Sequence, residues 1–352
     1  MSHESESAVP KSRTNHCMTS CREFLITFGG YSDWCKEGYD GFCIYNTLSE
    51  VWRQYDKPLP SASSSFDSSI CAVGNLVYIF GGACCGSHCR PTNTLISFHL
   101  IDNTWKTIFP DTARHGENTP PLMCGNFLFH HNESLYVIGG MAEHQYLDTI
   151  YKFCLKTSTW SLVQQNGPKP LFKGRIFGTV FKNQFYCLSG TSITKPHEFR
   201  EIWSFDFSTN AWTKKTTKSK TQKFPGCRIE ESLAFSSNCC YLSGGRNRSL
   251  KIIYSDIWKL DLETLEWYEL DYSLRTGLYL HCTSVVDDCY LFIFGGYGSR
   301  SNNHNTFERF IVRPPTLYRL GRESIIRSPN FERHMEYLPP FFVDEFRTNC
   351  KL

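Results

Sequence analysis

The chain has 352 residues and a formal net charge of +3, from 37 basic and 34 acidic side chains. Phe, Tyr and Trp make up 15% of it and charged residues 20%, which is typical of a globular protein with a large packed core. The near balance of charge excludes a strong basic field, so we expect no nucleic acid partner.

The N-terminal segment MSHESESAVPKSRTNH is polar. It lacks the apolar stretch of a signal peptide, and no run of 18 apolar residues in the sequence predicts a membrane span. We therefore expect a protein of the cytoplasm, the nucleus or both, with no membrane partner. Residues 1–12 are expected to be disordered or to close the ring of repeats that begins at residue 13.

Six short apolar runs each end in a pair of small residues. The pairs are Gly29-Gly30, Gly81-Gly82, Gly139-Gly140, Ser189-Gly190, Gly244-Gly245 and Gly295-Gly296. They lie 50 to 58 residues apart, and a tryptophan follows each of the first five pairs after 20 to 23 residues. The tryptophans are Trp52, Trp105, Trp160, Trp212 and Trp267. Self-similarity at this period predicts a repeat architecture.

Each unit predicts a four-stranded antiparallel sheet covered on both faces, because its strands are continuously apolar where burial of one face would give alternation. Six such sheets arranged radially cover one another, so residues 13–313 are expected to form an all-β, six-bladed β-propeller. The glycines allow close backbone approach, and the tryptophans fill the space between blades. The sixth unit has one strand after its glycines and no tryptophan before Pro314, so we expect its blade to be incompletely closed.

Seventeen cysteines without an export signal predict reduced thiols in strands, not a disulfide framework. The densest group is the segment ACCGSHC, with Cys84, Cys85, His88 and Cys89. No second pair of ligands accompanies this group, so a loop is favoured over a zinc site. We expect no metal and no cofactor.

The first strand of each propeller blade lies nearest the axis, so the residues that open these strands meet at one mouth of the central channel. Counting back from the small-residue pairs gives Arg13, His16, Arg175, Arg228, Ser232, Tyr279 and His281. Arginines in a confined mouth predict an anion site, and the C-terminal carboxylate of a peptide suits their paired donors. Glu230 and Glu231 stand in the same stretch and would neutralise the site or alter its preference. For each arginine, a salt bridge between blades is the competing interpretation.

Beyond Pro314 and Pro315 the pattern becomes helical. Thr316 is a candidate N-cap, Arg319 and Arg322 are expected on the outer face, and an apolar stripe is formed by Leu317, Leu320 and Ile325 or Ile326. A second apolar segment contains Leu338, Pro339, Phe341, Phe342, Val343 and Phe346. Residues 314–352 thus form either a helical hairpin that seals the edge of blade six or an exposed segment that docks in a partner's groove.

These features carry a resemblance to known families. A Gly-Gly strand end followed by a tryptophan on the fourth strand is the kelch signature. The set Thr316, Leu317, Leu320, Gly321 and Ile325 resembles the elongin-binding BC box of cullin-RING ubiquitin ligase receptors, and the set Leu338, Pro339 and Phe342 resembles the cullin-2 box. Together with the segments DIWKLDLETLEW, YLHC and FERFIV, the whole chain is similar to the kelch domain-containing protein 10 family, substrate receptors of cullin-2 ligases.

The resemblance implies a non-catalytic adaptor subunit of an E3 ubiquitin ligase. Its partners would be elongin B, elongin C and cullin-2 with its RING protein, and its substrates would be proteins with C-terminal degrons, commonly ending in glycine. Arg228 and Ser232 would be the main carboxylate contacts. The chain departs from the family in its short N-terminus, in Gly321 where Cys is common, and in lacking a tryptophan inside the box.

The alternative function is that of a kelch scaffold or cytoskeleton-associated interaction protein without ligase activity. Enzymes also use this fold, so the fold alone does not decide between functions. The blade count and the polar N-terminus disfavour a copper oxidase, the missing Asp-box disfavours a sialidase, and the missing nucleophile elbow disfavours a Ser-His-Asp hydrolase. We therefore expect no catalytic residues.

Overall fold

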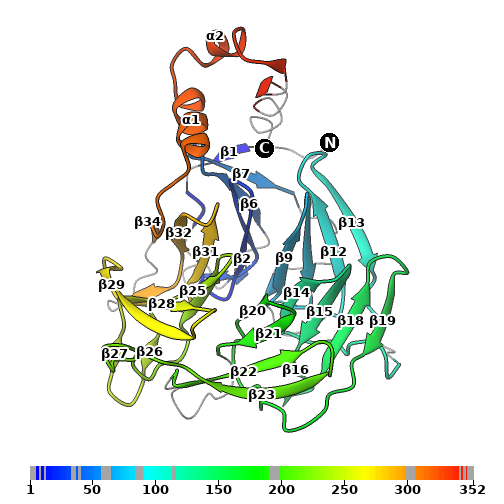
Figure 1. Ribbon diagram of the computed structural model, residues 1–352. Coiled ribbons are helices and arrows are strands. Elements are labelled where there is room, and N and C mark those ends of the chain that lie inside the picture. The colour runs from blue at the N-terminus through cyan, green and yellow to red at the C-terminus, as the bar shows by residue number, and fades with distance from the viewer. Residues whose placement is uncertain are drawn as a thin grey trace.

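The computed structural model describes residues 5–7, 9–11, 13–32, 37–38, 41–56, 65–84, 90–112, 116–189, 199–298, 306–340, 342–343 and 346. Six antiparallel sheets stand around a common axis, and two short helices follow them (Figure 1). This is a six-bladed, all-β propeller with a C-terminal helical segment, which confirms the fold predicted from the repeats.

Blades one to three follow the chain. Blade one contains β2 (Cys17–Cys21), β3 (Phe24–Phe28), β6 (Phe42–Asn46) and β7 (Val51–Tyr55). Blade two contains β9 (Ser69–Val73), β10 (Leu76–Phe80), β12 (Leu95–His99) and β13 (Thr104–Phe109). Blade three contains β14 (Phe127–His131), β15 (Ser134–Ile138), β18 (Ile150–Cys154) and β19 (Thr159–Leu162). In each blade the strands are paired antiparallel in chain order.

Blades four to six complete the ring. Blade four contains β20 (Gly178–Phe181), β21 (Gln184–Cys187), β22 (Glu201–Asp206) and β23 (Ala211–Thr216). Blade five contains β24 (Ser232–Phe235), β25 (Cys239–Ser243), β28 (Asp256–Asp261) and β29 (Glu266–Ser273). Blade six contains β31 (Cys282–Val286), β32 (Tyr290–Phe294) and β34 (Phe307–Ile311). Each first strand adjoins the first strands of its neighbours, so these six strands surround the channel.

Short two-stranded sheets lie at the glycine ends of the blades. They are β4 (Tyr31–Ser32) with β5 (Glu37–Gly38), β8 (Ser65–Phe66) with β11 (Ala83–Cys84), β16 (Met141–Ala142) with β17 (Gln145–Tyr146), β26 (Arg246–Asn247) with β27 (Ile252–Ile253), and β30 (Leu278–Tyr279) with β33 (Tyr297–Gly298). The glycine pairs are needed where the second strand ends. Gly244 has φ +57°, and a Cβ there would lie 2.4 Å from the carbonyl oxygen of Leu278. A side chain at this position would therefore clash with the next blade.

The five repeat tryptophans lie on the fourth strands and pack against the preceding blade in the ring. Trp267 of blade five is 1% exposed and packs with Leu188 and Ile202 of blade four. Three tryptophans also contact the phenylalanine seven residues before them on the third strand. The ring centroids are 4.9 Å apart for Phe98–Trp105, 5.0 Å for Phe153–Trp160 and 5.1 Å for Phe205–Trp212. The predicted structural role of the tryptophans is confirmed.

At residues 5–7 the N-terminal segment departs from both expectations that the sequence raised. Residues Ser5–Ser7 form β1, which pairs antiparallel with β7, the outer strand of blade one. The segment is therefore a fifth strand of blade one. It neither closes blade six nor, in the three residues that form β1, is it disordered.

Blade six lacks a fourth strand in the described part of the chain, and Pro315 explains why. In the other blades the residue two places before the tryptophan turns the hairpin with a left-handed backbone: Glu50, Asn103, Ser158, Asn210 and Leu265, with φ between 52° and 61°. Leu265 also donates its N–H to the carbonyl of Asp261 at 2.8 Å. The register of β34 on β32 matches that of β28 on β25 and aligns Pro315 with Leu265. Proline has φ near −65° and no N–H, so this turn cannot form.

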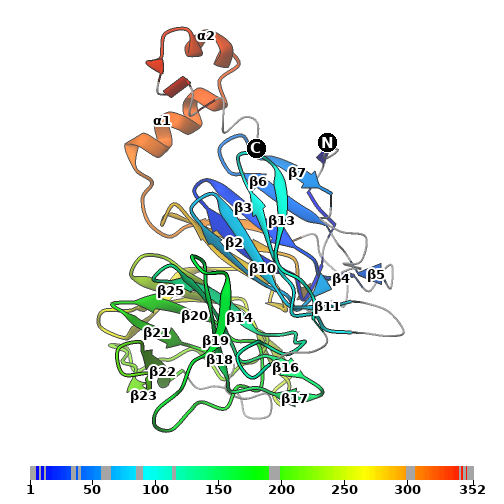
Figure 2. The ribbon, with the colours of Figure 1, turned by 90° about the vertical axis from the view of Figure 1, so that its right-hand side faces the viewer.

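The chain instead enters helix α1 (Leu317–Ile326), followed by α2 (Phe331–Met335). Thr316 is the predicted N-cap, since its hydroxyl accepts the N–H of Arg319 at 3.1 Å. Leu317 stands where the sixth tryptophan would fall. Both helices project from the turn ends of the strands, opposite the glycine ends (Figures 1 and 2). In the described part of the chain neither helix has the length and apolar character of a membrane span.

Candidate functional site

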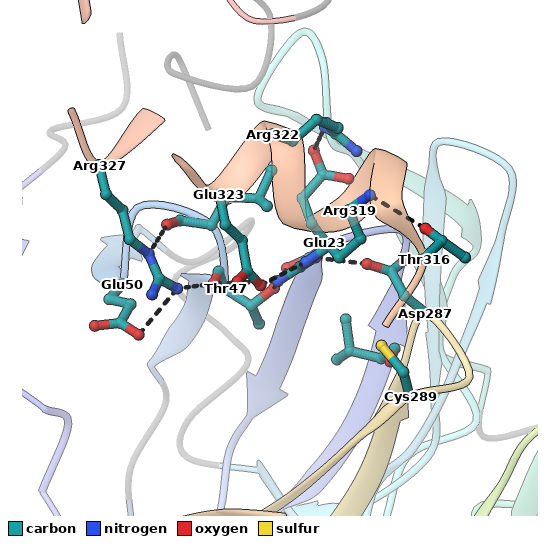
Figure 3. A network of polar contacts seen from close by, with 12 residues as sticks. Glu23, Thr47, Glu50, Asp287, Cys289, Thr316, Arg319, Arg322, Glu323 and Arg327 are labelled. Atoms are coloured by element: carbon teal, nitrogen blue, oxygen red, sulfur yellow. Dashed lines mark hydrogen bonds and ion pairs between the residues drawn. The ribbon is translucent and has the colours of Figure 1, made fainter. Parts of the chain in front are cut away.

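Helix α1 is docked on blades one and six through arginines, as Figure 3 shows. Arg319 is 4% exposed. Its guanidinium donates to Asp287 at 2.5 Å, to Glu323 at 2.8 Å and to the hydroxyl of Thr47 at 2.7 Å. Asp287 belongs to the turn between β31 and β32, and Thr47 to the turn between β6 and β7. One side chain thus ties the helix to two blades.

Two more arginines extend this contact. Arg322 donates to Glu23 at 2.8 Å, and the Glu23 side chain is almost completely buried. Arg327 donates to the carbonyl of Leu48 at 2.8 Å and forms an ion pair with Glu50 at 3.0 Å. The prediction that Arg319 and Arg322 take the outer face of α1 is therefore wrong. Their long side chains satisfy acceptors on the propeller turns, and this decides the rotation of the helix.

The opposite face of α1 is apolar and open to solvent. Leu317 is 87% exposed, Tyr318 50% and Leu320 44%. An added Cβ at Gly321 would meet no heavy atom of the described residues within 4 Å. Ile325 is half-buried. The leucines are thus not used to seal blade six, as the hairpin interpretation required.

The second C-terminal segment packs against α1 and α2. Met335 and Phe346 are buried, and the Phe346 ring meets that of Phe331 edge-on at 6.3 Å. The ring centroids of Phe342 and of Tyr318 on α1 are 6.4 Å apart. Leu338 is half-buried and Pro339 exposed, while Phe341 lies outside the described residues. The residues predicted as an elongin box and a cullin box therefore form one continuous helical module.

At the glycine end, a cavity of about 270 Å³ occupies the mouth of the channel. Five left-handed residues rim it, one from each blade except the fourth: Asn15, Asp67, Gly125, Glu230 and Leu280. Backbone hydrogen bonds join some of them across blades, from Asp67 to Asn15, from Gly125 to Asp67 and from Leu280 to Glu230. The fourth blade contributes Arg175 to the lining. The cavity and α1 lie on opposite faces of the propeller.

Arg228 lines this cavity, but its charge is already matched. Its guanidinium meets the Asp256 carboxylate with two bonds, of 2.6 and 2.8 Å, and also donates to the carbonyls of Gly226 and Gly244. Burial disfavours ionisation of Asp256, but the bonds and charge of Arg228 outweigh it and hold the pKa of Asp256 below its ordinary value. Of the two interpretations of Arg228, the geometry matches a structural ion pair, although the pair lies within blade five and not between blades. Arg228 is therefore not a free cation for a ligand.

Arg175 lies near two carboxyl groups, those of Asp67 and Glu231, and interacts with them through its charge and not through a hydrogen bond. Its guanidinium donates to the carbonyls of His16 and His281, at 2.9 and 3.2 Å, and to the Cys282 thiol. It is half-buried and lines the cavity. The acceptors that its guanidinium bonds are neutral, so its charge is opposed only at longer range, by Asp67 and Glu231.

The remaining predicted residues lie beneath or beside the cavity. His16 and His281 are buried, and burial, with Arg175 adding to it, lowers the pKa of both, that of His281 to about 3. Arg13 is 3% exposed and donates to the carbonyl of Gly29. Ser232 is fully buried, which does not fit its predicted contact with a ligand carboxylate. Tyr279 is half-buried on β30, with its ring 4.0 Å from the Arg246 guanidinium.

Acidic residues shape the mouth as much as basic ones. Burial raises the pKa of Glu231 to about 7 and that of Asp67 to about 6. Glu230 forms ion pairs with Arg246 and Arg248. Asp67 was missed in the sequence because it opens the second blade without any motif. The one sequence signal for Asp67 is its position in the repeat, two residues before a first strand, which it shares with the other left-handed residues of the rim.

Within the described residues, no cluster of three or more His, Cys, Asp or Glu side chains is arranged to hold a metal ion. Cys85, His88 and Cys89 of the ACCGSHC segment lie outside the described residues. Free thiols are found at Cys17, Cys21, Cys43, Cys71, Cys124, Cys154, Cys187, Cys227, Cys239, Cys240, Cys282 and Cys289. The prediction of reduced cysteines is confirmed for these twelve.

Comparison with known proteins agrees with this architecture. The KLHDC2/KLHL20/DRC7 Kelch-repeats domain matches residues 67–296, which is more than half of the chain, so the chain belongs to this kelch-repeat family. Proteins of this family are generally non-catalytic interaction scaffolds.

Similarity to individual relatives extends beyond the propeller. Kelch domain-containing protein 10 of Rattus norvegicus is 25% identical over 342 residues, covering 91% of this chain and 81% of the relative. The Homo sapiens protein of the same name is also 25% identical, covering 91% of this chain and 75% of the relative. The Drosophila melanogaster homolog is 22% identical over 326 residues, covering 82% of this chain and 52% of the relative. The predicted resemblance is confirmed at this level.

Proposed function

We propose that this chain is a substrate-recognition subunit of an E3 ubiquitin ligase built on elongin B, elongin C and cullin-2. The exposed face of α1 carries the proposal. Leu317 and Leu320 project from a helix whose other face is fixed by Arg319, and with only the described residues present their side chains are exposed. Large apolar anchors on one helix face supply most of the binding energy when a helix docks in a groove.

The small residue at Gly321 supports the same proposal. Gly321 costs the helix about 1 kcal/mol relative to alanine, yet the described residues leave free space around it and give no reason for the missing side chain. Close approach of a partner would give that reason. Leu338, Pro339 and Phe342 would extend the contact to cullin-2.

The channel mouth is the proposed substrate site. A substrate's C-terminal carboxylate would be held by Arg175, whose guanidinium is paired with neutral acceptors. Arg228 would support the site by orienting Asp256 and the blade-five backbone. Because the cavity and α1 lie on opposite faces, substrate and adaptor would bind without competing for the same surface.

The first experiment tests the adaptor. The chain is co-expressed with elongin B and elongin C and purified through a tag on elongin B. We expect co-purification of the unaltered chain and its loss in Leu317→Asp. The matched control is Leu250→Asp, since Leu250 is also an exposed leucine, 65% exposed, at the glycine end. A folded chain that ignores elongins, or a Leu317→Asp variant that still binds them, would favour the alternative of a scaffold or cytoskeleton-associated protein.

The second experiment tests the pocket without changing the protein. A fluorescent peptide ending in glycine is titrated as the free acid and as the C-terminal amide. We expect the amide to bind at least tenfold more weakly, because it removes a charge-assisted contact. Equal affinity of the two forms would contradict a carboxylate site, whatever the result with elongins.

A further inference from the structure

Among the described residues, the outer edge of strand β34 carries no paired strand. The N–H of Gly295 donates to the carbonyl of Thr306, and the N–H of Val312 donates to the carbonyl of Cys289. Because backbone groups alternate in direction along an antiparallel strand, those of Phe307, Arg309 and Ile311 point away from β32. No strand pairs with that side among the described residues. Ile311 is 59% exposed, so the edge is accessible.

The free edge is the place of a missing strand and not the natural border of the repeat. In the other five blades a fourth strand covers the same edge. In blade six Pro315 prevents the hairpin that would bring the chain back, and β1 pairs with β7 instead. The space between blades five and six beside this edge is partly filled. Phe310 lies seven residues before Leu317, which stands in the place of the missing tryptophan, and its ring stacks on that of Tyr272 of blade five, with 5.3 Å between the ring centroids. The described chain therefore leaves a ready strand position open.

The surroundings of this edge are basic. Arg309 and Arg327 share the single carboxylate of Glu50, at 3.3 and 3.0 Å. Arg313 is exposed and bonds to the neutral side chain of Asn238 at 3.0 Å. Glu308 is buried, facing blade five, where it accepts the N–H of Arg275. Asp288 lies beside Asn238, where it accepts the N–H of Ser237. Three guanidinium groups, of Arg309, Arg313 and Arg327, thus surround this edge with two carboxylates, of Glu50 and Asp288.

We propose that the outer edge of β34 is a docking site for an extended acidic segment of another protein, which pairs antiparallel with β34 and completes blade six as its fourth strand. Main-chain hydrogen bonds to Phe307, Arg309 and Ile311 provide the affinity, as in other cases of strand addition. The arginines around the edge select for acidic side chains and against basic ones. This site is separate from both the channel mouth and the exposed face of α1.

The probe is a synthetic peptide, acetylated and amidated, with the sequence LEWYELDYS of residues 265–273, because this is the chain's own acidic fourth strand from blade five. Hydrogen exchange of the full-length chain is followed with and without it. We expect slower exchange at the amides of residues 307, 309 and 311, and no effect from the same peptide with its three acidic residues replaced by lysine. Unchanged exchange of these three amides at the highest soluble concentration of the acidic peptide would overturn the proposal.

Two variants sharpen the test. Ile311→Pro removes one outward donor and leaves the bonds to β32 in place, so binding is expected to weaken roughly fivefold from the loss of one backbone hydrogen bond. Arg313→Glu changes no backbone group and is expected to weaken binding at low salt only. If both variants bind the peptide like the unaltered chain, the proposal is wrong. A concentration-dependent dimer that Ile311→Pro dissolves would also overturn it, because the edge would then belong to a second copy.

Discussion

Arg319 of α1 and Asp287 of blade six form an ion pair with a distance of 2.5 Å, and the arginine side chain is almost completely buried. Two residues before it, Leu317 is almost completely exposed. The helix therefore uses its charged face for its own protein and leaves its apolar face to solvent, the reverse of an ordinary surface helix. The arginine contacts dock α1 on the propeller while its leucines stay exposed.

Replacing Arg319 is expected to release the helix. Arg319→Ala leaves Asp287 and Glu323 without their shared partner and removes the bond to Thr47. We expect a loss of about 2 kcal/mol in the stability of the helical module, because bonds to charged groups are lost in a partly buried setting. Hydrogen exchange should speed up at the amides of residues 320–327 and stay unchanged in the propeller strands.

Arg333→Ala is the matched control, since Arg333 is an exposed arginine on the neighbouring helix α2. It should leave the exchange of α1 as it is. If Arg319→Ala exchanged at the same rates as the unaltered chain, the docking of α1 through its arginine face would be refuted.

The ion pair between Arg228 and Asp256 is expected to be structural. Arg228→Ala should cost about 3 kcal/mol in the free energy of unfolding, since it leaves a mostly buried carboxylate unpaired. The double variant with Asp256→Ala should recover part of this loss, and a cycle of urea denaturation measurements gives the coupling energy. Additive losses in the two single variants would show that the pair does not stabilise blade five.

Glu231 is expected to make stability depend on pH. Its folded pKa of about 7 lies above the ordinary 4.5, so the folded chain binds the proton more tightly than the unfolded chain. The carboxyl therefore lowers stability progressively as pH rises from about 4.5 to 7, and by a constant amount above. Glu231→Gln removes this loss. The free energy of unfolding of the variant should therefore exceed that of the unaltered chain by an amount that grows between pH 4.5 and 7, to at most about 3 kcal/mol.

The relevant measurement is the difference in stability between Glu231→Gln and the unaltered chain. Buried His281, with its pKa lowered to about 3, makes stability rise with pH in both proteins, and this contribution cancels in the difference. Thermal unfolding at pH 4.5, 5.5, 6.5 and 7.5 measures the difference. Glu332→Gln, at an exposed position on α2, is the control and should show a constant difference. A constant difference for Glu231→Gln as well would mean that the carboxyl is not held protonated.

The repeat could be predicted from the sequence because each blade needs the same packing residues at the same places. Glycine pairs, tryptophans and apolar runs recur at one period, so the blade number follows from Gly29 to Gly296 without any structure. The turn geometry was readable too, although less directly. Pro315 falls where Leu265 has a φ of +55°, and only alignment of the repeats reveals this conflict. Local rules of this kind survive in any blade because each blade repeats the same contacts.

The candidate sites were only partly readable, since they depend on which partners the fold brings together. Arg228 and Asp256 are 28 residues apart in the chain, and nothing in either segment shows that they neutralise each other. Likewise, helical periodicity marks the two faces of α1 but does not say which face docks. The arginine face docks because Glu23, Thr47 and Asp287 happen to line the turns below, on blades one and six.

Gly321 offers a test that separates the needs of this chain from those of a partner. Its added Cβ would meet no atom within 4 Å in the part of the chain that the structure describes, and its φ is not in the left-handed region. Gly321→Ala should therefore stabilise α1 by up to about 1 kcal/mol, through helix propensity.

Gly321→Leu should also fold normally, as judged by thermal unfolding, but should lose elongin co-purification, because the larger side chain would hold the partner away. Ser324→Leu, an exposed residue of the same helix, is the control for added apolar bulk. If Gly321→Leu bound elongins as well as Ser324→Leu did, the small volume at this position would have no role in partner recognition.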